Sequence, residues 1–265
     1  MIHLRGITWN HTRGLVPMVA SAQRFEELHP DVRITWEKRS LQEFADQPLA
    51  ELGARYDLLV IDHPWAGFAA DTGVLMAMED VVSPEFLADQ AANSVGPSYG
   101  SYRYGDRQWA LPIDAATPVA SWRPDLLEQA GATVPRTWEE LLELAHRGLV
   151  IMPGIPQDTI MNFYMFCELP GSDLFAGDEV VVSDEIGIMA LERMRELSSL
   201  MPREIFDWNP IAVYEAMTRS DDYAYCPWAY GYSNYAREGY ARAILHFGDV
   251  VSLDGVPLRT TLGGT

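Results

Sequence analysis

The chain has 265 residues, of which 48% are hydrophobic and 22% charged, and its formal net charge is −19. This length suits two globular domains, and the excess of acidic residues argues against nucleic acid or an anionic membrane as a partner. No apolar run approaches the eighteen or more residues that a membrane span needs, and no signal peptide precedes the first strand-like segment.

The first hundred residues alternate between strand and helix patterns. Residues 4–9 are predicted to form a strand, 14–30 an amphipathic helix and 32–39 an alternating strand. A helix is expected over 41–54, and the continuous apolar run at 56–62 predicts a buried strand of a parallel sheet. Another helix is expected to begin at Ser83. This β-α-β-α-β order predicts an α/β domain with helices on the faces of its sheet.

The composition changes at the glycine- and tyrosine-rich residues 96–112, where we expect a loop, a hairpin and the first domain boundary. Beyond this segment, Thr137 and Glu140 have the spacing of a capping box. The second half is therefore predicted to be α/β as well, but richer in helix. Its helices are expected at 123–131, 137–146, 156–168, 184–201 and from Asn209 onward, and its strands at 148–154 and 222–230.

Candidate ligand-binding residues follow from the rule that open α/β sheets bind ligands beyond the carboxyl ends of their strands. Each position selected in this way carries an aromatic ring or a planar polar group. These positions are Trp9, His11, Arg13, Asp62, His63, Trp65, Asp114, Trp228, Tyr230 and Tyr232. Rings that stack on the C–H faces of a sugar, beside polar groups of fixed direction, favour a carbohydrate ligand. Packing at a domain interface is the alternative explanation for the rings.

Other chemistries find less support in the sequence. His11, His63 and Asp62 lack the spacing of a metal site, and the chain has neither a phosphate loop nor a Gly-x-Ser-x-Gly motif, so we expect no metal and no cofactor. Asp62 and Asp114 would suit a glycosidase acid/base pair only at a particular separation. Cys167 and Cys226 fit no metal spacing and are expected to be buried thiols rather than a disulfide.

Residues 109–145 closely resemble the extracellular solute-binding proteins of sugar ABC transporters, the maltose-binding-protein-like family. The resemblance rests on Ala110-Leu111-Pro112, on "RPDLLEQAG" at 123–131 and on "PRTWEEL" at 135–141. Weaker similarity extends over nearly the whole chain. Where the family often has a tyrosine before the arginine of the second motif, this chain has Ser121-Trp122.

The resemblance implies a two-lobed periplasmic-binding-protein fold of type II, in which each lobe is a mainly parallel sheet flanked by helices. The implied parts are a first lobe at 1–111, a hinge segment at 112–118, a second lobe at 119–256, and the start of a strand returning to the first lobe at 257–265. The family pattern continues past this point by roughly 80 to 120 residues, so the chain resembles a C-terminally truncated member.

The implied function is capture of a sugar between the lobes and its delivery to an ABC permease, without chemistry. The implied location is periplasmic, or extracellular and membrane-associated, and the complete protein is expected to be monomeric. Two alternatives stay open, namely a sugar-acting enzyme that uses Asp62 and Asp114, and a sugar-sensing module uncoupled from transport. The charge of the sugar is also open, because Arg13 and His11 suit either an anionic sugar or the capping of backbone carbonyls.

Overall fold

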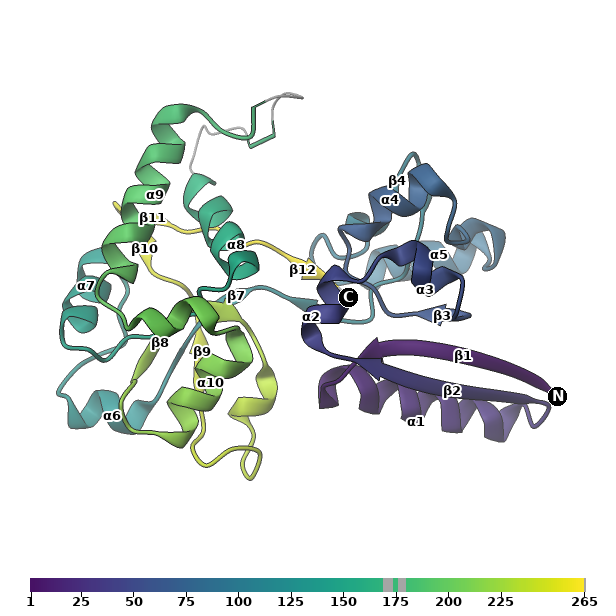
Figure 1. The fold of residues 1–265 in the computed structure, drawn as a ribbon, viewed down its shortest axis with the longest axis horizontal. Coiled ribbons are helices and arrows are strands. Elements are labelled where there is room, and N and C mark those ends of the chain that lie inside the picture. The colour runs from purple at the N-terminus through teal and green to yellow at the C-terminus, as the bar shows by residue number, and fades with distance from the viewer. Residues whose placement is uncertain (169–173, 176–179, 265) are drawn as a thin grey trace. The chain divides into compact units, whose positions relative to one another are not determined.

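The computed structural model describes residues 1–168, 174–175 and 180–264, which form two compact units (Figure 1). Unit 1 comprises Met1–Ala115 and Gly263–Thr265, and unit 2 comprises Ala116–Leu262. Each unit combines helices with β-structure around hydrophobic clusters of its own. The α/β class with two lobes is therefore confirmed. Within the described ranges, every helix is too short or too polar to span a membrane.

Unit 1 is built on a sheet of three parallel strands in the order β2-β1-β3. Helix α1 lies along β1 and β2 on one face of this sheet, and α3 and α4 lie on the other side (Figure 1). The elements of the unit are β1 (Ile2–Trp9), α1 (Thr12–Leu28), β2 (Val32–Arg39), α2 (Leu41–Asp46), α3 (Leu49–Gly53), β3 (Leu58–Leu59), α4 (Trp65–Thr72), α5 (Pro84–Asn93), β4 (Arg103–Tyr104) and β5 (Arg107–Gln108). Strand β6 (Ala115–Ala116) lies at the boundary of the units and pairs with β12 (Gly263–Gly264).

The first unit departs from the sequence prediction in two places. The single helix expected over 41–54 is two short helices, because Pro48 disfavours helical backbone at Gln47 and itself lacks the N–H that a continuous helix needs. Helix α4 was not predicted, and it begins at Trp65, which we expected at the end of a strand. The parallel sheet, the helix cap at Ser83 and the hairpin within 96–112 are confirmed.

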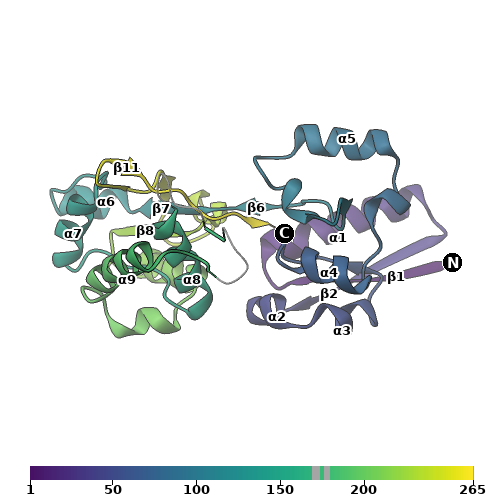
Figure 2. The same cartoon turned by 90° about the horizontal axis from the view of Figure 1, so that it is seen from above.

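Unit 2 contains most of the buried hydrophobic residues, and α8 and α9 pack side by side in it (Figure 2). The capping box of Thr137 with Glu140 and the cap at Asn209 are confirmed, and Cys167 and Cys226 are both buried. The elements of the unit are β7 (Pro118–Trp122), α6 (Pro124–Gln129), α7 (Trp138–His146), α8 (Pro156–Cys167), α9 (Asp184–Ser198), α10 (Pro210–Arg219), β8 (Tyr225–Tyr230), β9 (His246–Gly248), β10 (Ser252–Leu253) and β11 (Val256–Pro257). Short 3-10 turns lie at Met78–Asp80, Gly100–Tyr102, Arg203–Asp207 and Ser233–Ala236.

The sheet of unit 2 has the order β8-β7-β9, and both of its strand pairs are antiparallel. The expectation of a mainly parallel sheet therefore holds for unit 1 and is wrong for these three strands. The segment 148–154, which we predicted as a strand, forms only an isolated parallel bridge from Val150 to Tyr225. Its apolar residues are buried in the core without a continuous ladder of hydrogen bonds.

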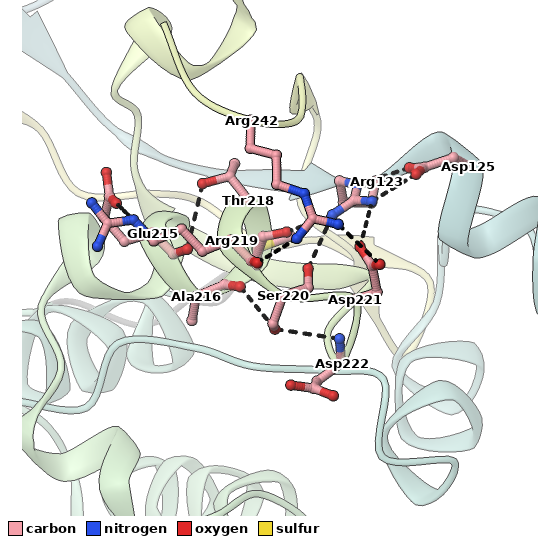
Figure 3. Close-up of polar contacts among 11 residues, drawn as sticks. Arg123, Asp125, Glu215, Ala216, Thr218, Arg219, Ser220, Asp221, Asp222 and Arg242 are labelled. Carbon is pink, nitrogen blue, oxygen red and sulfur yellow. Dashed lines mark hydrogen bonds and ion pairs between the residues drawn. The ribbon is translucent and has the colours of Figure 1, made fainter.

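A buried arginine joins β7, α6 and the end of α10 in unit 2 (Figure 3). Arg123 forms a two-point contact with Asp125, with Nε–Oδ1 and Nη2–Oδ2 distances of 2.8 and 2.6 Å, and a third contact with Asp221 at 3.0 Å. Its Nη1 donates to the carbonyl oxygens of Met217 and Ser220. The five N–H donors of the guanidinium thus have acceptors, and two of these acceptors are carbonyls at the C-terminal end of α10.

The first turn of α1 requires glycine because the ring of Trp9 lies against it. A Cβ atom on Gly14 would lie 2.4 Å from Cδ2 of Trp9. We therefore expect Gly14→Ala to lower the free energy of unfolding by about 1–3 kcal/mol, even though alanine favours helix more than glycine does. Chemical denaturation measures the change, and Gly100→Ala is the control, since a Cβ atom on Gly100 would meet no atom within 4 Å apart from its chain neighbours. Equal stability of the two variants would show that the Trp9 ring moves freely.

Candidate functional site

The candidate site lies at the carboxyl ends of the strands of unit 1. Strand β1 ends at Trp9, next to the last residue of β2, Arg39, and the chain then turns through His11 into α1. Strand β3 is followed closely in the chain by Asp62. The segment that leaves unit 1 adds Asp114, which reaches Arg13 on the first turn of α1. Sheet topology thus gathers side chains from four parts of the sequence.

His11 is the N-cap of α1, and its imidazole is turned toward the backbone. Its Nδ1 accepts a hydrogen bond from the backbone N–H of Arg13 at 3.1 Å. Burial and, secondarily, the positive charge of Arg13 lower the pKa of His11 below its usual value of 6.5. The imidazole is therefore predominantly neutral at pH 7 and contributes no positive charge to the site.

Arg13 and Asp114 form an ion pair, with Nε of the arginine 2.7 Å from Oδ2 of the aspartate. Their side chains are 20% and 25% exposed, but the two atoms in contact, Nε of Arg13 and Oδ2 of Asp114, are buried. The guanidinium also lies 5.8 Å from the centre of the Trp9 ring. The negative charge of Asp114 balances the positive charge of Arg13. The pair therefore offers hydrogen-bonding groups to a ligand rather than an uncompensated positive charge.

Asp62 lies near two arginines, and its carboxyl group is still hard to ionise. Burial raises its pKa to about 7, although the charges of Arg39 and Arg13 act in the opposite direction. Arg39 is 6% exposed and donates to the carbonyl oxygens of Val60 at 3.0 Å and Glu43 at 3.4 Å. Burial therefore outweighs the attraction of the arginines at Asp62, and the carboxyl group changes its protonation near neutral pH.

A buried tyrosine lies beside the same carboxylates. Tyr102 is fully buried, and its hydroxyl is 3.5 Å from the carbonyl oxygen of Ile61. Burial first, and then the negative charges of Asp62 and Asp114, raise its pKa far above 10, so the hydroxyl stays protonated. The ring of His63 meets that of Tyr102 edge-on, with ring centres 6.4 Å apart, and burial lowers the pKa of His63.

The structure thus brings together His11, Arg13, Asp62 and Asp114, with His63 adjoining them through Tyr102. The two tryptophans that we expected at this site instead pack against phenylalanine rings. Trp9 is 2% exposed and packs on Phe44, with ring centres 5.1 Å apart, so its assignment to a ligand wall is corrected to the core. Trp65 is partly buried at the start of α4, edge-on to Phe68.

The aromatic residues expected at the end of β8 mostly fill the core of unit 2. Trp228 is 1% exposed, stacked 6.4 Å from Trp138 and edge-on to Phe166 at 5.3 Å. This burial corrects the expectation that its ring is exposed to stack on a sugar. Tyr232 is 4% exposed and contacts Tyr214 edge-on at 6.4 Å. The remaining ring, that of Tyr230, is partly buried and its hydroxyl lies 2.9 Å from Oγ1 of Thr261.

Sequence reasoning missed Arg39 and Tyr102. The strand-end rule should have selected Arg39, because the strand at 32–39 was predicted with its final residue at that position. Tyr102 lies within the glycine- and tyrosine-rich segment, and no local pattern distinguishes it from the other tyrosines there. Only the fold shows that its hydroxyl reaches the backbone just beyond β3.

The assembled groups suit hydrogen bonding to a polar, uncharged molecule. Carboxylates accept hydrogen bonds from hydroxyls, and guanidinium and imidazole groups donate or accept them in fixed directions. Within the part of the chain that the structure describes, no group of three or more His, Cys, Asp or Glu side chains is arranged to hold a metal ion. The side chains at these strand ends are of the kinds that recognise a ligand through hydrogen bonds.

Comparison with known proteins matches a family model to about half of the chain. Residues 8–148 match the family described as bacterial extracellular solute-binding protein. A mannitol-binding protein of Pseudomonas aeruginosa is 30% identical over 139 residues, which cover 50% of this chain and 31% of that protein. The matched region thus spans about a third of the length of this curated relative.

Solved structures share the fold of the whole chain at low sequence identity. The maltose-bound MalE3 of T. maritima matches with a TM-score of 0.80 at 17% identity, over 100% of this chain and 71% of that one. A solute-binding protein of an ABC transporter from Agrobacterium radiobacter, in complex with ribitol, matches with a TM-score of 0.79 at 19% identity. This match covers 99% of this chain and 70% of that one. A solute-binding protein of an ABC transporter from Agrobacterium vitis, with bound D-mannitol, matches with a TM-score of 0.71 at 14% identity. This match covers 100% of this chain and 67% of that one.

The fold and the family match indicate the same family. The structure has the two-lobed α/β architecture of these neighbours, and the family match covers more than half of the chain, including all of residues 109–145. The family is described as one of solute-binding proteins, and this description gives no support to a catalytic role for Asp62 and Asp114. The chain belongs to the bacterial extracellular solute-binding proteins.

Proposed function

We propose that this chain binds a sugar or polyol and delivers it to an ABC importer. The observation that carries the proposal is the gathering of Arg13, Asp62 and Asp114, with the neutral His11, at the strand ends of unit 1. These groups match the hydrogen-bonding needs of hydroxyls. The mannitol-binding relative and the neighbours solved with maltose, ribitol and mannitol favour the same ligand class.

We further propose that residues 112–118 and 257–265 act as the hinge between the lobes. On the side of unit 2 these segments are tied together, because Thr117 contacts Thr260 and donates to the carbonyl oxygen of Thr261 at 3.1 Å. Closure about such a hinge would present a surface to permease subunits. The family's extracellular location supports a periplasmic or membrane-associated extracellular site of action.

A thermal-shift screen tests the ligand class directly. A ligand at a hundred times its dissociation constant stabilises the folded protein by about 2.7 kcal/mol, which raises the melting temperature measurably. We expect a shift with at least one of D-mannitol, ribitol and maltose, and none with sodium chloride at matched osmolarity. If no neutral sugar or polyol shifts the melt or titrates by calorimetry, the proposed function is wrong.

We expect Asp62→Ala to weaken binding of the ligand found in this screen by roughly ten- to 150-fold. The change removes a hydrogen bond to a carboxylate, which contributes about 1.5–3 kcal/mol. Calorimetric titration at pH 7.5 measures the loss. Asp71→Ala is the control, because Asp71 is an exposed aspartate on α4 of the same unit. Equal affinity of Asp62→Ala and the wild type would place the ligand elsewhere.

A further inference from the structure

The two segments that connect unit 2 to unit 1 are tied to each other just inside unit 2. Unit 2 begins at Ala116 and ends at Leu262, so Thr117 is its second residue and Thr261 its second-to-last. The hydroxyl of Thr117 contacts that of Thr260 and donates to the carbonyl oxygen of Thr261 at 3.1 Å. The outgoing and the returning segment therefore reach the boundary of unit 2 as one hydrogen-bonded pair.

Strand β8 holds this pair of segments to the body of unit 2. The hydroxyl of Tyr230, the last residue of β8, lies 2.9 Å from Oγ1 of Thr261. The backbone N–H of Gly231, the next residue, donates to the carbonyl oxygen of Thr117 at 3.3 Å. Each of the two segments thus has its own hydrogen bond to the end of β8.

The end of β8 is itself held in place by the core of unit 2. Tyr214 of α10 is fully buried, and its hydroxyl donates to the carbonyl oxygen of Tyr230 at 3.2 Å. Tyr230 also pairs with Pro118 in the antiparallel ladder of β7 and β8. Leu258, three residues before Thr261, is buried in the hydrophobic core of unit 2. The hydroxyl of Tyr230 therefore ties a fixed strand to a segment that is anchored a few residues earlier.

Beyond these ties, each connecting segment contains residues that can bend. On the outgoing segment, Pro112 and Pro118 enclose residues 113–116, and a proline restricts both its own backbone and that of the residue before it. On the returning segment, Gly263 and Gly264 can adopt backbone angles that other residues avoid. Hinges are a few residues that absorb large changes of backbone angle. The ties thus lie between the core of unit 2 and the residues best suited to bending.

We propose that the hydroxyl of Tyr230 and Oγ1 of Thr261 form a latch, which holds the returning segment to unit 2 and confines bending of the hinge to residues 113–116 and 262–264. Tyr230 is a positioning residue, because its hydroxyl acts on the hinge through Thr261. The latch rests on the hinge in the proposed function, but it does not depend on which ligand binds, and both of its residues belong to unit 2.

Trypsin cleavage after Arg259 reports how tightly the returning segment is held. Arg259 lies just before the tied residues, and its side chain is 78% exposed. Where opening and closing are fast, cleavage tracks the population of the open form. We expect Tyr230→Phe, which keeps the ring, to be cut after Arg259 roughly three- to tenfold faster than the wild type, because one hydrogen bond is lost. Mass spectrometry of the cleaved chains measures the rate.

Two controls make the measurement specific to the latch. Tyr225→Phe changes the other end of β8, where the hydroxyl of Tyr225 has no hydrogen-bond partner among the described residues, so cleavage after Arg259 should stay within twofold of the wild type. Cleavage after Arg242, whose side chain is 64% exposed in the same unit, should keep its rate in Tyr230→Phe. Faster cleavage at both arginines would show a general loss of stability and would overturn the latch.

A double-mutant cycle tests whether the two hydroxyls act on each other. Thr261→Val removes Oγ1 but keeps the carbonyl oxygen to which Thr117 donates. If the latch exists, the variant with both changes is cut after Arg259 no faster than Tyr230→Phe alone. Effects that multiply in the double variant would mean that the two side chains act separately, which would contradict the latch.

Binding of D-mannitol, ribitol and maltose separates the latch from ligand recognition. If Tyr230→Phe is cut after Arg259 at the wild-type rate, the latch is wrong, and a loss of affinity in that variant would then place its hydroxyl on the ligand. If cleavage is faster as expected and the wild type binds none of these probes, the latch is supported and the proposed function is contradicted.

Discussion

Arg123→Met is expected to lower the free energy of unfolding by about 2–4 kcal/mol. The variant keeps an unbranched apolar stem but removes the guanidinium, which has acceptors for all five of its N–H groups. Removing one member of a buried ion pair costs about 3–5 kcal/mol when its partners stay buried. Asp125 and Asp221 are more than half exposed, so water rehydrates them and the loss is smaller.

Arg242 is the matched control for this prediction. It contacts the same Asp221, at 3.3 Å, and donates to the carbonyl oxygen of Arg219 at the same end of α10 (Figure 3). Its side chain is 64% exposed, so Arg242→Met should cost less than about 1 kcal/mol. Urea denaturation of both variants measures the difference. If the two losses are equal, burial of Arg123 adds nothing to the stability of the corner between β7 and α10.

Much of the fold follows from local sequence patterns. The alternation at 32–39 and the run at 56–62 predicted the parallel sheet of unit 1, and the helix caps at Ser83, Thr137 and Asn209 are where expected. The direction of the strands in unit 2 was not predictable in this way. Strands β7 and β8 are about a hundred residues apart in the chain, and their antiparallel pairing depends on how the intervening helices pack.

The candidate site was predictable only in its polar part. The strand-end rule identified Asp62 and Arg13 because both closely follow strands of the parallel sheet. The same rule misplaced Trp9 and Trp228, whose rings are buried by residues distant in the sequence. A large ring beyond a strand can turn into the core or out of it, and the partner that decides, such as Trp138 for Trp228, is recognisable only in the folded chain.

Asp158→Asn is expected to stabilise the protein at pH 7.5 by about 1–4 kcal/mol relative to the wild type, and this advantage should disappear by pH 4. The carboxyl group titrates near 3.8 when unfolded, and burial raises its pKa to about 7 in the folded protein. Between these values the folded state holds more protons than the unfolded state, so the contribution of Asp158 to stability falls as pH rises from about 4 to 7. Three pH units correspond to about 4 kcal/mol, an upper limit because the side chain keeps slight exposure.

Several other buried groups also change the stability of the wild type with pH. Comparing the wild type with Asp158→Asn isolates the contribution of Asp158. The lowered pKa values of His11 and His63 act in the opposite direction, because the unfolded state binds more protons than the folded state as pH falls below about 6.5. Asp62, whose pKa is also raised to about 7, acts in the same direction as Asp158. All three contributions are common to the wild type and Asp158→Asn, so they cancel in the difference between the two proteins.

Melts of wild type, Asp158→Asn and the exposed control Asp184→Asn at pH 4, 5, 6 and 7.5 measure this difference. The advantage of Asp158→Asn should grow steadily with pH, because the wild type must either keep a proton on Asp158 or bury an unpaired negative charge. Asp184→Asn should show no such growth, since an aspartate exposed at the start of α9 has no burial to overcome. A constant difference between Asp158→Asn and the wild type from pH 4 to 7.5 would mean that Asp158 titrates normally. Its carboxylate would then have a partner or access to solvent that offsets its burial in the folded protein.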